Sequence, residues 1–456
     1  MAQGYYKQGL HRRKSIFHLF FRKAPFGGDF AVSAGLPLVV DLLEGLRFSA
    51  DDVQYLGRQK GADGKPRFTE SFLNYLQRLR FSGDVYAIPE GEMVYPHEPL
   101  LRIEANLLEA QLIETALLTV INFSTLIATK AARIKTAAGP TSRVMEFGLR
   151  RAQGIDGGLT ASRAAYLGGC DATSNVWAGR YYNIPIAGTH AHSWIMVFPD
   201  EITSFEAYAH ALPNNCTLLV DTYDTIEGVE NAIRIGRQLR EKGHELLGIR
   251  LDSGDLEALA KAARKLLDEA GFKESRIVAS NDLDEYSIQA LRESGAPITV
   301  WGVGTRLVTA KDQPALGGVY KLAAVQDEQG KWEPRMKLSE QLIKISNPGR
   351  LQVRRYYDQQ GLPAGSQLYD EFQGEPTRKL ITEKGTTPLD DYSEQRDLLQ
   401  VIFEQGKLVA ELEDLPTARE RALRQYQRFG QLPRHQYGLS VELHSQKMEL
   451  SNQLQA

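Results

Sequence analysis

The fold of this chain is indicated most clearly by residues 216–255, which read CTLLVDTYDTIEGVENAIRIGRQLREKGHELLGIRLDSGD. Two apolar runs, Cys216–Thr222 and Leu246–Asp252, have the composition of buried strands, and the pattern from Glu227 to Glu241 between them is helical. A strand, a helix and a strand in this order make a βαβ unit, which joins parallel strands. The stretch therefore predicts a parallel sheet whose strands each end in a polar motif.

The same alternation of short apolar runs and longer helical patterns extends outward to about residues 140 and 325. Seven strands in one such series favour an α/β barrel, while a doubly wound open sheet is the alternative. In both architectures ligands bind where the strands end and the connecting loops begin. The remaining predicted elements are strands at Arg143–Phe147, Ile184–Thr189, Arg276–Asn281, Ile298–Gly302 and Gly318–Ala324, and a helix at Leu256–Ala270.

The flanks of this series have a different pattern. Aromatic and alternating positions in Arg13–Ala34 and Leu338–Phe372 suggest antiparallel strands of a second domain that both chain ends build. Asp327–Pro334 has the composition of a surface turn, and Asp414–Gly430 that of a late helix. We expect an N-terminal α+β domain at residues 1–135, an α/β barrel catalytic domain at 136–325, and a C-terminal segment at 326–456 that completes the N-terminal domain and packs on the barrel.

Length and composition exclude several classes of protein. The 456 residues are enough for two or three domains, and the 42% hydrophobic and 24% charged residues are close to globular averages. The 54 basic and 57 acidic residues give a net charge of −3, which argues against a general nucleic-acid or membrane-surface binder but allows a local anion pocket. Cys170 and Cys216 are too few for a disulfide framework, so a reducing cytoplasm is the expected compartment.

No export signal or membrane span is predicted. The apolar stretch Ile16–Phe21 is short, contains His18 and lacks a small-residue cleavage site. The longer apolar run Thr115–Ala128 falls short of the roughly 20 residues that span a bilayer. Its apolar positions recur at three- and four-residue spacing, which predicts a buried helix.

Unusual polar residues gather where the predicted strands end. A catalytic α/β domain should carry its chemistry at these points rather than in its helices. The coincidence of six such motifs predicts one composite site. The motifs are EFGLRR (146–151), GTHAHS (188–193), VDTYD (220–224), RLDSGD (250–255), SNDLD (280–284) and GVGTR (302–306).

The motif GTHAHS places His190 and His192 on the same side of an extended segment. Such a pair can hold a metal, but a metal-dependent barrel hydrolase would need further histidines after later strands, where this chain carries aspartates. The pair can instead supply a nucleophilic or phosphate-accepting histidine, if a carboxylate such as Asp221 holds the far ring nitrogen protonated. For the motif without its context, two ordinary surface or core histidines are the alternative.

Two further motifs suit a sugar phosphate. Arg250 and Asp252 combine a guanidinium that binds phosphate with a carboxylate that accepts sugar hydroxyls or binds magnesium; a surface salt bridge is the simpler alternative. Gly302 and Gly304 would let backbone amides approach a phosphate, although short glycine loops are common and no GxxxxGK[ST] pattern occurs there.

Phe147 is followed closely by Arg150 and Arg151, a grouping that suits a stacked aromatic ring bearing a carboxylate or phosphate. A core phenylalanine with solvated arginines is the simpler alternative. Each motif alone is a modest signal. Together the strand ends supply arginines, aspartates, glycines and a histidine, and no serine elbow, metal cluster or dinucleotide fingerprint competes with them. We therefore expect a phosphorylated, ribose-like ligand.

Several long runs carry a resemblance to one known family. They are EFGLRRAQGIDGGLTASRAAYLGGCDATSNVWAGRYYNIPIAGTHAHS (146–193), LLVDTYDTIEGVENAIR (218–234), GIRLDSGDL (248–256), ASNDLDE (279–285), WGVGTRLVTA (301–310) and HLFFRKAPFGGDFAVSAGL (18–36). These runs closely resemble the nicotinate phosphoribosyltransferases, and the resemblance covers nearly the whole chain.

The resemblance implies an enzyme of NAD biosynthesis by salvage. Such an enzyme joins nicotinate to the ribosyl carbon of phosphoribosyl pyrophosphate and releases nicotinate mononucleotide and pyrophosphate, with ATP hydrolysis coupled through a phosphohistidine and with Mg²⁺ as cofactor. The implied fold is an irregular (β/α) barrel of phosphoribosyltransferase type II with a mixed α+β domain. The implied assembly is a cytoplasmic homodimer with shared active sites, without nucleic-acid or membrane partners.

The resemblance also implies roles for individual residues by motif position. The implied catalytic residues are His192, which becomes phosphorylated, Asp221, which orients it, Arg250, near the pyridine and phosphates, and Asp252, a ribose or magnesium contact. The implied substrate-binding residues are Phe147, Arg150, Ser174, Ser280, Gly302, Gly304 and Thr305, together with Arg22 from the neighbouring subunit. Ser174 stands where the related nicotinamide enzyme has an acid, and a neutral residue there spares the carboxylate of nicotinate a like-charge clash.

One departure from the family pattern concerns the N-terminus. A segment like TDxYQLT, whose tyrosine stacks on the pyridine in the partner's site, would precede Met1-Ala2-Gln3-Gly4-Tyr5-Tyr6. The expectation is that the start is mis-assigned or that this lid is lost. The alternatives are quinolinate or nicotinamide phosphoribosyl transfer on the same scaffold, a metal-dependent barrel hydrolase, and a non-catalytic relative that binds phosphoribosyl pyrophosphate.

Overall fold

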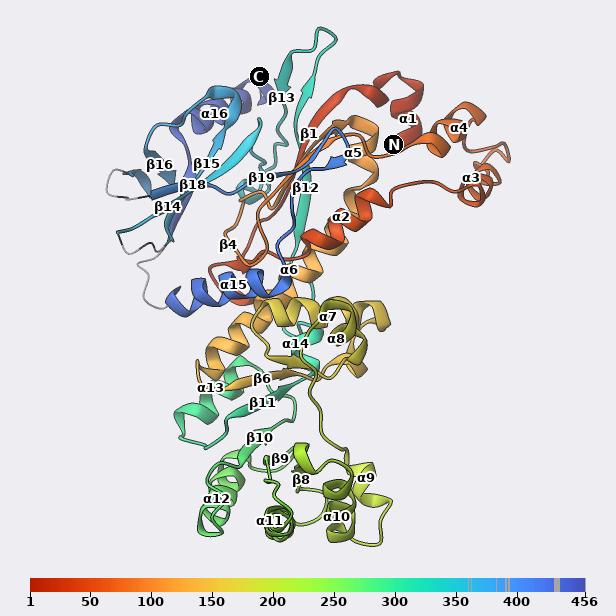
Figure 1. Ribbon diagram of the computed structural model, residues 1–456. Helices are drawn as coiled ribbons and strands as arrows, with labels where there is room; N and C mark the ends of the chain where they lie inside the picture. The colour runs from red at the N-terminus through yellow and green to blue at the C-terminus, as the bar shows by residue number, and fades with distance from the viewer. Residues whose placement is uncertain are drawn as a thin grey trace. The chain divides into compact units, whose positions relative to one another are not determined.

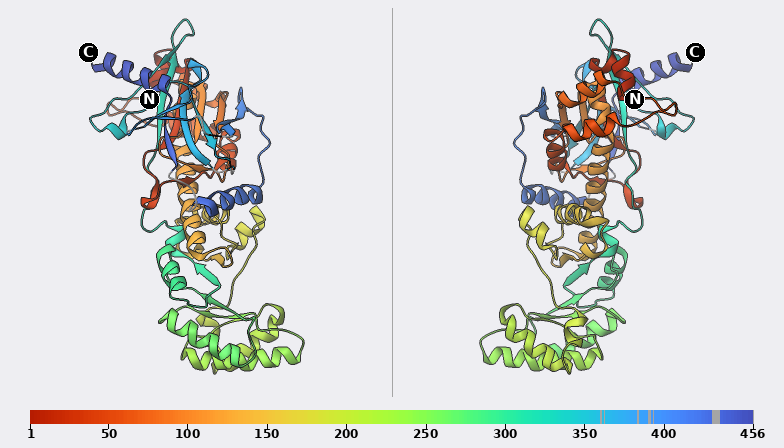
Figure 2. Two further views of the ribbon diagram at one scale, coloured as in Figure 1. Left: turned by 90° about the vertical axis from the view of Figure 1, so that its left-hand side faces the viewer. Right: turned by 90° about the vertical axis from the view of Figure 1, so that its right-hand side faces the viewer.

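The computed structural model describes residues 1–455 except 360, 362, 383, 390, 391, 393 and 430–434. The chain forms two compact units (Figure 1, Figure 2). Unit 1 comprises Met1–Leu126 and Ala315–Ala456, and unit 2 comprises Ile127–Pro314. Both chain ends therefore contribute to unit 1, while unit 2 is formed by one continuous stretch.

Unit 2 contains a six-stranded sheet in which every pairing is parallel, as the sequence predicts. Its strands, in spatial order, are β7 (Ala172–Thr173), β6 (Arg143–Glu146), β11 (Val300–Val303), β10 (Arg276–Ala279), β9 (Gly248–Leu251) and β8 (Thr217–Leu219). The two edges of the sheet are β7 and β8, and no strand pairing joins them within residues 127–314, which the structure describes without a gap. Unit 2 is thus an α/β unit with a parallel sheet.

One predicted strand of this series does not form. Ile184–Thr189 makes only an isolated bridge between Ile186 and Thr173. Pro185 has no N–H group to donate to a ladder, which explains why the apolar run does not continue as a strand. The strand next to this bridge, β7, was not predicted, because two residues are too few to show a periodicity.

A second predicted strand forms in a different sheet. Gly318–Ala324 lies in β12 (Gly318–Gln326), which pairs antiparallel with β1 (Lys14–Phe21) of unit 1. The expected catalytic range 136–325 thus runs past Pro314, where unit 2 ends. A single strand pattern shows that a strand forms but not which sheet it joins, since pairing depends on distant residues.

The helices of unit 2 follow its strands. Asp224, Asp255 and Asp284 each cap the helix that begins at the next residue, because their carboxylates accept hydrogen bonds from its first-turn N–H groups. One carboxylate in each of VDTYD, RLDSGD and SNDLD is therefore structural. The helices are α7 (Gly154–Leu167), α8 (Val176–Tyr182), α9 (His192–Met196), α10 (Glu201–Ala211), α11 (Thr225–Glu241), α12 (Leu256–Glu269), α13 (Glu285–Glu293) and α14 (Thr305–Val308).

Unit 1 is built largely of antiparallel strands, as the flanking sequences predict. Its first sheet is wholly antiparallel, its second has one parallel pair, β15 with β21, and β2 (Ala31–Val32) pairs with β4 (Met93–Val94). In spatial order, the first sheet is β13 (Trp332–Pro334), β12, β1, β5 (Leu101–Asn106), β3 (Asp84–Ala87), β19 (Gln400–Glu404) and β20 (Lys407–Leu408), and the second is β17 (Gly385–Pro388), β16 (Lys379–Thr382), β21 (Gln436–Leu439), β15 (Pro363–Asp370), β14 (Leu351–Tyr357) and β18 (Glu394–Asp397).

The long apolar helix predicted at Thr115–Ala128 is part of α6 (Glu114–Ala138). By length and composition α6 would suffice to cross a membrane, but 61% of its most apolar window is buried within the protein. Most of this apolar stretch is therefore packed in the core of the protein. The predicted late helix is α15 (Leu415–Phe429); the expected end at Gly430 lies outside the described residues. The other α-helices are α1 (Ala2–Lys7), α2 (Leu36–Glu44), α3 (Ala50–Gly57), α4 (Glu70–Arg78), α5 (Leu107–Leu112) and α16 (Val441–Gln455).

A close approach of α11 to the end of β8 yields a prediction about stability. A Cβ atom at Gly228 would collide with the carbonyl oxygen of Val220, so Gly228→Ala should destabilise the protein by about 1–3 kcal/mol. Gly157 in α7 is the matched control, because a Cβ there meets only Gln153, at 4.0 Å. Gly157→Ala should stabilise by about 0.5–1 kcal/mol through helix propensity. Urea unfolding measures both; equal effects would contradict this packing.

Candidate active site

One face of the unit 2 sheet carries several of the predicted site residues. We call it the inner face. Paired residues on parallel strands face the same side, as do residues two apart on one strand. Arg250 pairs with Val278, and Val278 with Val300, so these three side chains share a face. The residues two positions further along the chain are Asp252 and Ser280, each directly after its strand, and Gly302 within β11.

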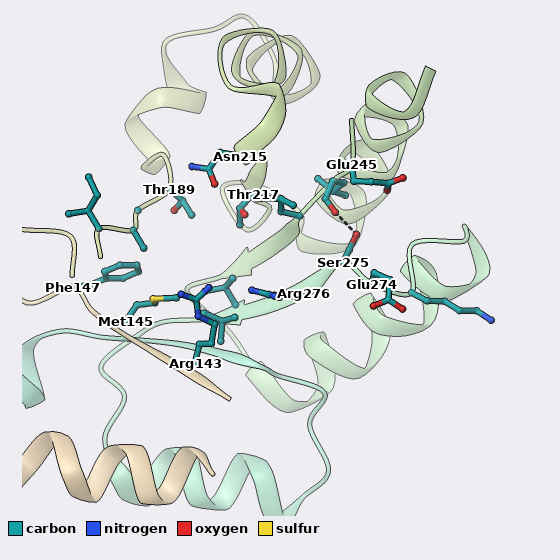
Figure 3. A pocket seen from close by; sticks show the side chains of 18 of the residues that line it. Arg143, Met145, Phe147, Thr189, Asn215, Thr217, Glu245, Glu274, Ser275 and Arg276 are labelled. Atoms are coloured by element: carbon teal, nitrogen blue, oxygen red, sulfur yellow. Dashed lines mark hydrogen bonds between the residues drawn. The ribbon is translucent and has the colours of Figure 1, made fainter. Parts of the chain in front are cut away.

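A cavity of about 910 Å³ lies along this face (Figure 3). Part of its wall is apolar, because Met145, Val278 and Val300 belong to one buried cluster against which Phe147 packs. Phe147 is only partly buried and lines the cavity together with Thr189. The cavity thus reaches the carboxyl ends of the strands, where the sequence predicts the site.

Arg250 connects three segments of the site. Its Nε donates to Ser280 Oγ at 2.8 Å, its Nη1 to Thr189 Oγ1 at 3.0 Å and its Nη2 to Asp252 Oδ1 at 2.9 Å. The guanidinium carbon lies 5.8 Å from the centre of the Phe147 ring, within the range of a cation–π contact. Arg250, Asp252, Ser280 and Phe147 are therefore brought together as predicted.

Asp252 is held in its charged form. Burial opposes ionisation, but hydrogen bonds from Ser280 and Arg250 and the charge of Arg250 outweigh it and lower the pKa of the Asp252 carboxyl. Its second oxygen, Oδ2, lies 3.8 Å from Nε2 of His192. The carboxylate therefore presents one oxygen to the arginine and serine and the other toward the histidine.

The structure gives His192 a different partner from the predicted one. Nδ1 of His192 lies 3.0 Å from Thr222 Oγ1, whereas Asp221 Oδ2 accepts from the Asp252 N–H and the Ser253 hydroxyl, both at 2.7 Å. Asp221 thus fixes the RLDSGD loop instead of orienting His192. Sequence reasoning missed Thr222, because VDTYD places it at the same strand end as Asp221 but does not show which of the two meets His192.

His190 has a structural role. It is buried, and its Nε2 accepts a hydrogen bond from the Leu219 N–H at 3.2 Å, which requires a neutral ring. Burial also lowers the pKa of His190 to about 4. Within the part of the chain that the structure describes, no three His, Cys, Asp or Glu side chains are grouped to hold a metal ion. The arrangement therefore does not support the hydrolase alternative.

The glycines of GVGTR are explained in part by packing. A Cβ atom at Gly302 would come within 2.8 Å of the Phe147 ring, so glycine is needed to make room for the aromatic side chain. A Cβ at Gly304 would lie 3.1 Å from the Phe147 carbonyl oxygen. Gly304 precedes α14, and Thr305 is the first residue of that helix. The loop lies at the carboxyl end of β11, close to Phe147.

The remaining predicted residues are more exposed or lie elsewhere. Arg150 is exposed in the short helix Leu149–Arg151, and Ser174 is exposed after β7, with its N–H bonded to the Glu146 carbonyl. Arg22 follows β1 and belongs to unit 1. The residues of unit 2 thus form the core of the site without Arg22.

Sequence reasoning assigned no role to Glu146, the first residue of EFGLRR. Its carboxylate is buried and accepts hydrogen bonds from the hydroxyls of Ser162 and Thr173 and from the Gly148 N–H. It thereby holds the turn that carries Phe147 and Arg150. The sequence signal that could have found Glu146 is an acidic residue inside the predicted strand Arg143–Phe147.

Comparisons with known proteins show which family the chain resembles. The nicotinate phosphoribosyltransferase N-terminal domain family matches residues 1–122, and the nicotinate phosphoribosyltransferase family matches residues 142–338. A nicotinate phosphoribosyltransferase of Bacillus subtilis is 44% identical over 90% of this chain and 83% of its own length. The human one is 36% identical over 93% of this chain and 88% of its own length.

Solved structures show the same relationship. The crystal structure of human nicotinic acid phosphoribosyltransferase superposes with a TM-score of 0.85 at 32% identity, covering 99% of this chain and 98% of that one. A nicotinate-nucleotide pyrophosphorylase from Pyrococcus furiosus shares the fold, with a TM-score of 0.72 at 23% identity over 94% of this chain and 93% of that one. The chain belongs to the nicotinate phosphoribosyltransferase family.

Proposed function

We propose that this chain joins nicotinate to the ribosyl carbon of phosphoribosyl pyrophosphate, forming nicotinate mononucleotide and pyrophosphate for NAD biosynthesis, with coupled ATP hydrolysis. Family membership supports the transfer reaction. The observation that carries the proposal is the Arg250, Asp252 and Ser280 network beside Phe147 at the carboxyl ends of the parallel strands. It joins a guanidinium, a carboxylate and an aromatic face in one site.

The pyridine would stack on Phe147. The ring of Phe147 is partly exposed to the cavity, and Arg250 lies close enough to attract a carboxylate on a stacked ring. Ser174, which is exposed after β7, adds no negative charge there. Stacking would hold the pyridine nitrogen in line with the ribosyl carbon, which lowers the entropic part of the barrier.

The ribose and phosphates would bind around Asp252 and Ser280. The ionised Asp252 can accept ribose hydroxyls and stabilise positive charge at the ribosyl carbon as pyrophosphate leaves. Arg150 is exposed and suited to a phosphate, and Gly302, Gly304 and Thr305 supply backbone near the same edge. Each of these groups lies in unit 2.

The residues present fit a magnesium ion that arrives with the substrate. Magnesium binds through one or two carboxylates together with substrate phosphates. Asp252 is ionised, and Asp221 Oδ1 is buried without a hydrogen-bond partner among the described residues. Asp252 would hold the ion, and Asp221 is the second candidate. When bound, magnesium would neutralise charge on the pyrophosphate.

His192 would accept the γ-phosphoryl group of ATP. In the tautomer whose Nδ1–H donates a hydrogen bond to Thr222 Oγ1, the lone pair lies on Nε2, and the His192 side chain is 38% exposed. Nε2 would form the N–P bond as the bond between the γ-phosphorus and the bridging oxygen breaks and ADP leaves. Thr222 takes the orienting role that the sequence assigned to Asp221.

The proposal extends to assembly and location. Val176, Trp177, Tyr181 and Ile186 of unit 2 are about half exposed or more, which supports a partner subunit that covers them and supplies Arg22 in a homodimer. If β7 and β8 came together, the six strands would run in chain order around a ring, which supports an irregular barrel.

Cys170 and Cys216 are free, buried thiols, and burial raises the pKa of Cys216 to about 12, which suits a reducing cytoplasm.

A substrate assay tests the proposed reaction. Purified protein with phosphoribosyl pyrophosphate and magnesium should form the mononucleotide from nicotinate, and it should do so faster with ATP. Nicotinate should be the preferred pyridine, because Arg250 and a neutral Ser174 favour a single carboxylate on the ring. Nicotinamide and quinolinate should react at least about tenfold less efficiently, the free-energy difference of a single charged contact. Chromatography of the products measures this; a preference for either other pyridine would contradict the assignment.

Replacing His192 tests the coupling to ATP. His192→Ala should abolish ATP stimulation and acid-labile phosphorylation by γ-labelled ATP while leaving slow, ATP-independent transfer, since the residues around Phe147 are unchanged. His210→Ala is the control, because His210 is exposed on α10. Full ATP stimulation in the His192 variant would refute its role as the phosphoryl acceptor.

A further inference from the structure

The cavity that Phe147 lines also reaches the amino ends of the strands. Arg143 stands two residues before Met145 and four before Phe147, and it pairs with Val300. Arg276 stands two residues before Val278. Both arginines line the same cavity as Phe147 (Figure 3). The cavity therefore runs along the inner face from the carboxyl ends of the strands to their amino ends.

The amino ends of the strands form a charged opening, which we call the amino-end mouth. Arg240 of this mouth is already committed, because its Nε lies 3.0 Å from Glu245 and its guanidinium lies 3.9 Å from the Phe272 ring centre. The other three basic residues are Arg143, Lys273 and Arg276. Within residues 127–314, which are described without a gap, they have no acidic partner within ion-pair distance. The charged residues of the mouth are Arg143, Arg240, Glu245, Lys273, Glu274 and Arg276.

The charge of the mouth is positive. With Arg240 and Glu245 paired, Glu274 alone offsets Arg143, Lys273 and Arg276. A cleft with an excess of one sign of charge attracts ions of the opposite sign and raises their rate of association. In a chain whose net charge is −3, this local excess is not a consequence of composition.

The part of the cavity between the amino-end mouth and Phe147 suits a small aromatic acid. The cavity of about 910 Å³ is at the upper end of the range of small-molecule pockets, larger than a single pyridine needs. Between the arginines and Phe147 its wall is apolar, formed by Met145, Val278 and Val300. An apolar wall with cations at its end favours a flat ring that carries a carboxylate over a polyphosphate.

We infer that the amino-end mouth is a second binding site for an aromatic carboxylate, through which nicotinate reaches Phe147 from the side opposite to the ribose and phosphates. This inference rests on the proposed function for the identity of the acid. Phosphoribosyl pyrophosphate bound at Asp252 and Ser280 would obstruct the carboxyl-end approach, whereas the amino-end route stays open. Nicotinate could then bind after the sugar phosphate, with Arg143 and Arg276 attracting its carboxylate.

The double variant Arg143→Gln/Arg276→Gln tests this route in the full-length protein. At saturating phosphoribosyl pyrophosphate, kcat/KM for nicotinate should fall about tenfold at low salt, the lower bound for loss of electrostatic steering. The difference should shrink at high salt, because screening removes the same attraction from the native protein. The value of kcat and the KM for phosphoribosyl pyrophosphate should change less than twofold, a factor within the scatter expected for surface substitutions.

The matched control is Arg234→Gln/Arg237→Gln. Both residues are exposed on α11 outside the cavity, and the control removes the same two charges. It should leave all kinetic constants unchanged. Lys273→Gln, a change in the turn before β10, is a second variant if the arginine double variant unfolds early by circular dichroism; it should lower kcat/KM for nicotinate by a smaller factor in the same direction.

Direct binding separates this inference from the proposed function. Fluorine NMR of 5-fluoronicotinate, without phosphoribosyl pyrophosphate, should show weaker binding to the Arg143 and Arg276 variant than to the control. Neutral 3-acetylpyridine should bind both proteins equally. If the native protein forms no mononucleotide, the proposed function fails and this comparison still decides the site. Equal binding of 5-fluoronicotinate and equal kcat/KM in the variant and the control would overturn the inference.

Discussion

The guanidinium of Arg250 holds the site together through one set of hydrogen bonds. It reaches Ser280 on the strand-end loop of β10, Thr189 in the GTHAHS segment and Asp252 beyond its own strand. A planar group with donors on three nitrogens in fixed directions can satisfy three acceptors on separate loops at once, whereas the donors of a lysine all lie on one nitrogen. The same interaction keeps Asp252 charged and leaves the guanidinium beside Phe147. The chemistry of the site therefore depends on how this one side chain is placed.

The register of the parallel strands supplies that placement. Arg250 lies opposite Val278, so it shares the inner face with the apolar cluster, and Asp252 and Ser280 follow on the same face. Asp221 adds a second constraint, because its carboxylate binds the Asp252 N–H and the Ser253 hydroxyl. Backbone pairing and the two hydrogen bonds to the Asp221 carboxylate thus position the site before any substrate binds, which reduces the cost of ordering it.

Much of this arrangement was predictable from local sequence. The strand ends followed from apolar runs bounded by polar motifs, and α11 and α12 followed from helical periodicity. Contacts between distant segments were not predictable in this way. VDTYD gave no means of telling that Asp221 binds the RLDSGD loop while Thr222 meets His192, because in an extended chain adjacent side chains point in opposite directions. Likewise, the strand pattern at Gly318 did not reveal its pairing with β1.

We expect Arg250 to act through its three hydrogen bonds and not merely through its charge. Steady-state kinetics of Arg250→Lys test this most directly, because the substitution keeps the charge and removes the fork. We predict that kcat/KM for both nicotinate and phosphoribosyl pyrophosphate falls about 100-fold, the cost of a misplaced site, with the unfolding temperature within a few degrees of the native value. Kinetic constants within about threefold of the native ones, less than a single hydrogen bond contributes, would contradict the account.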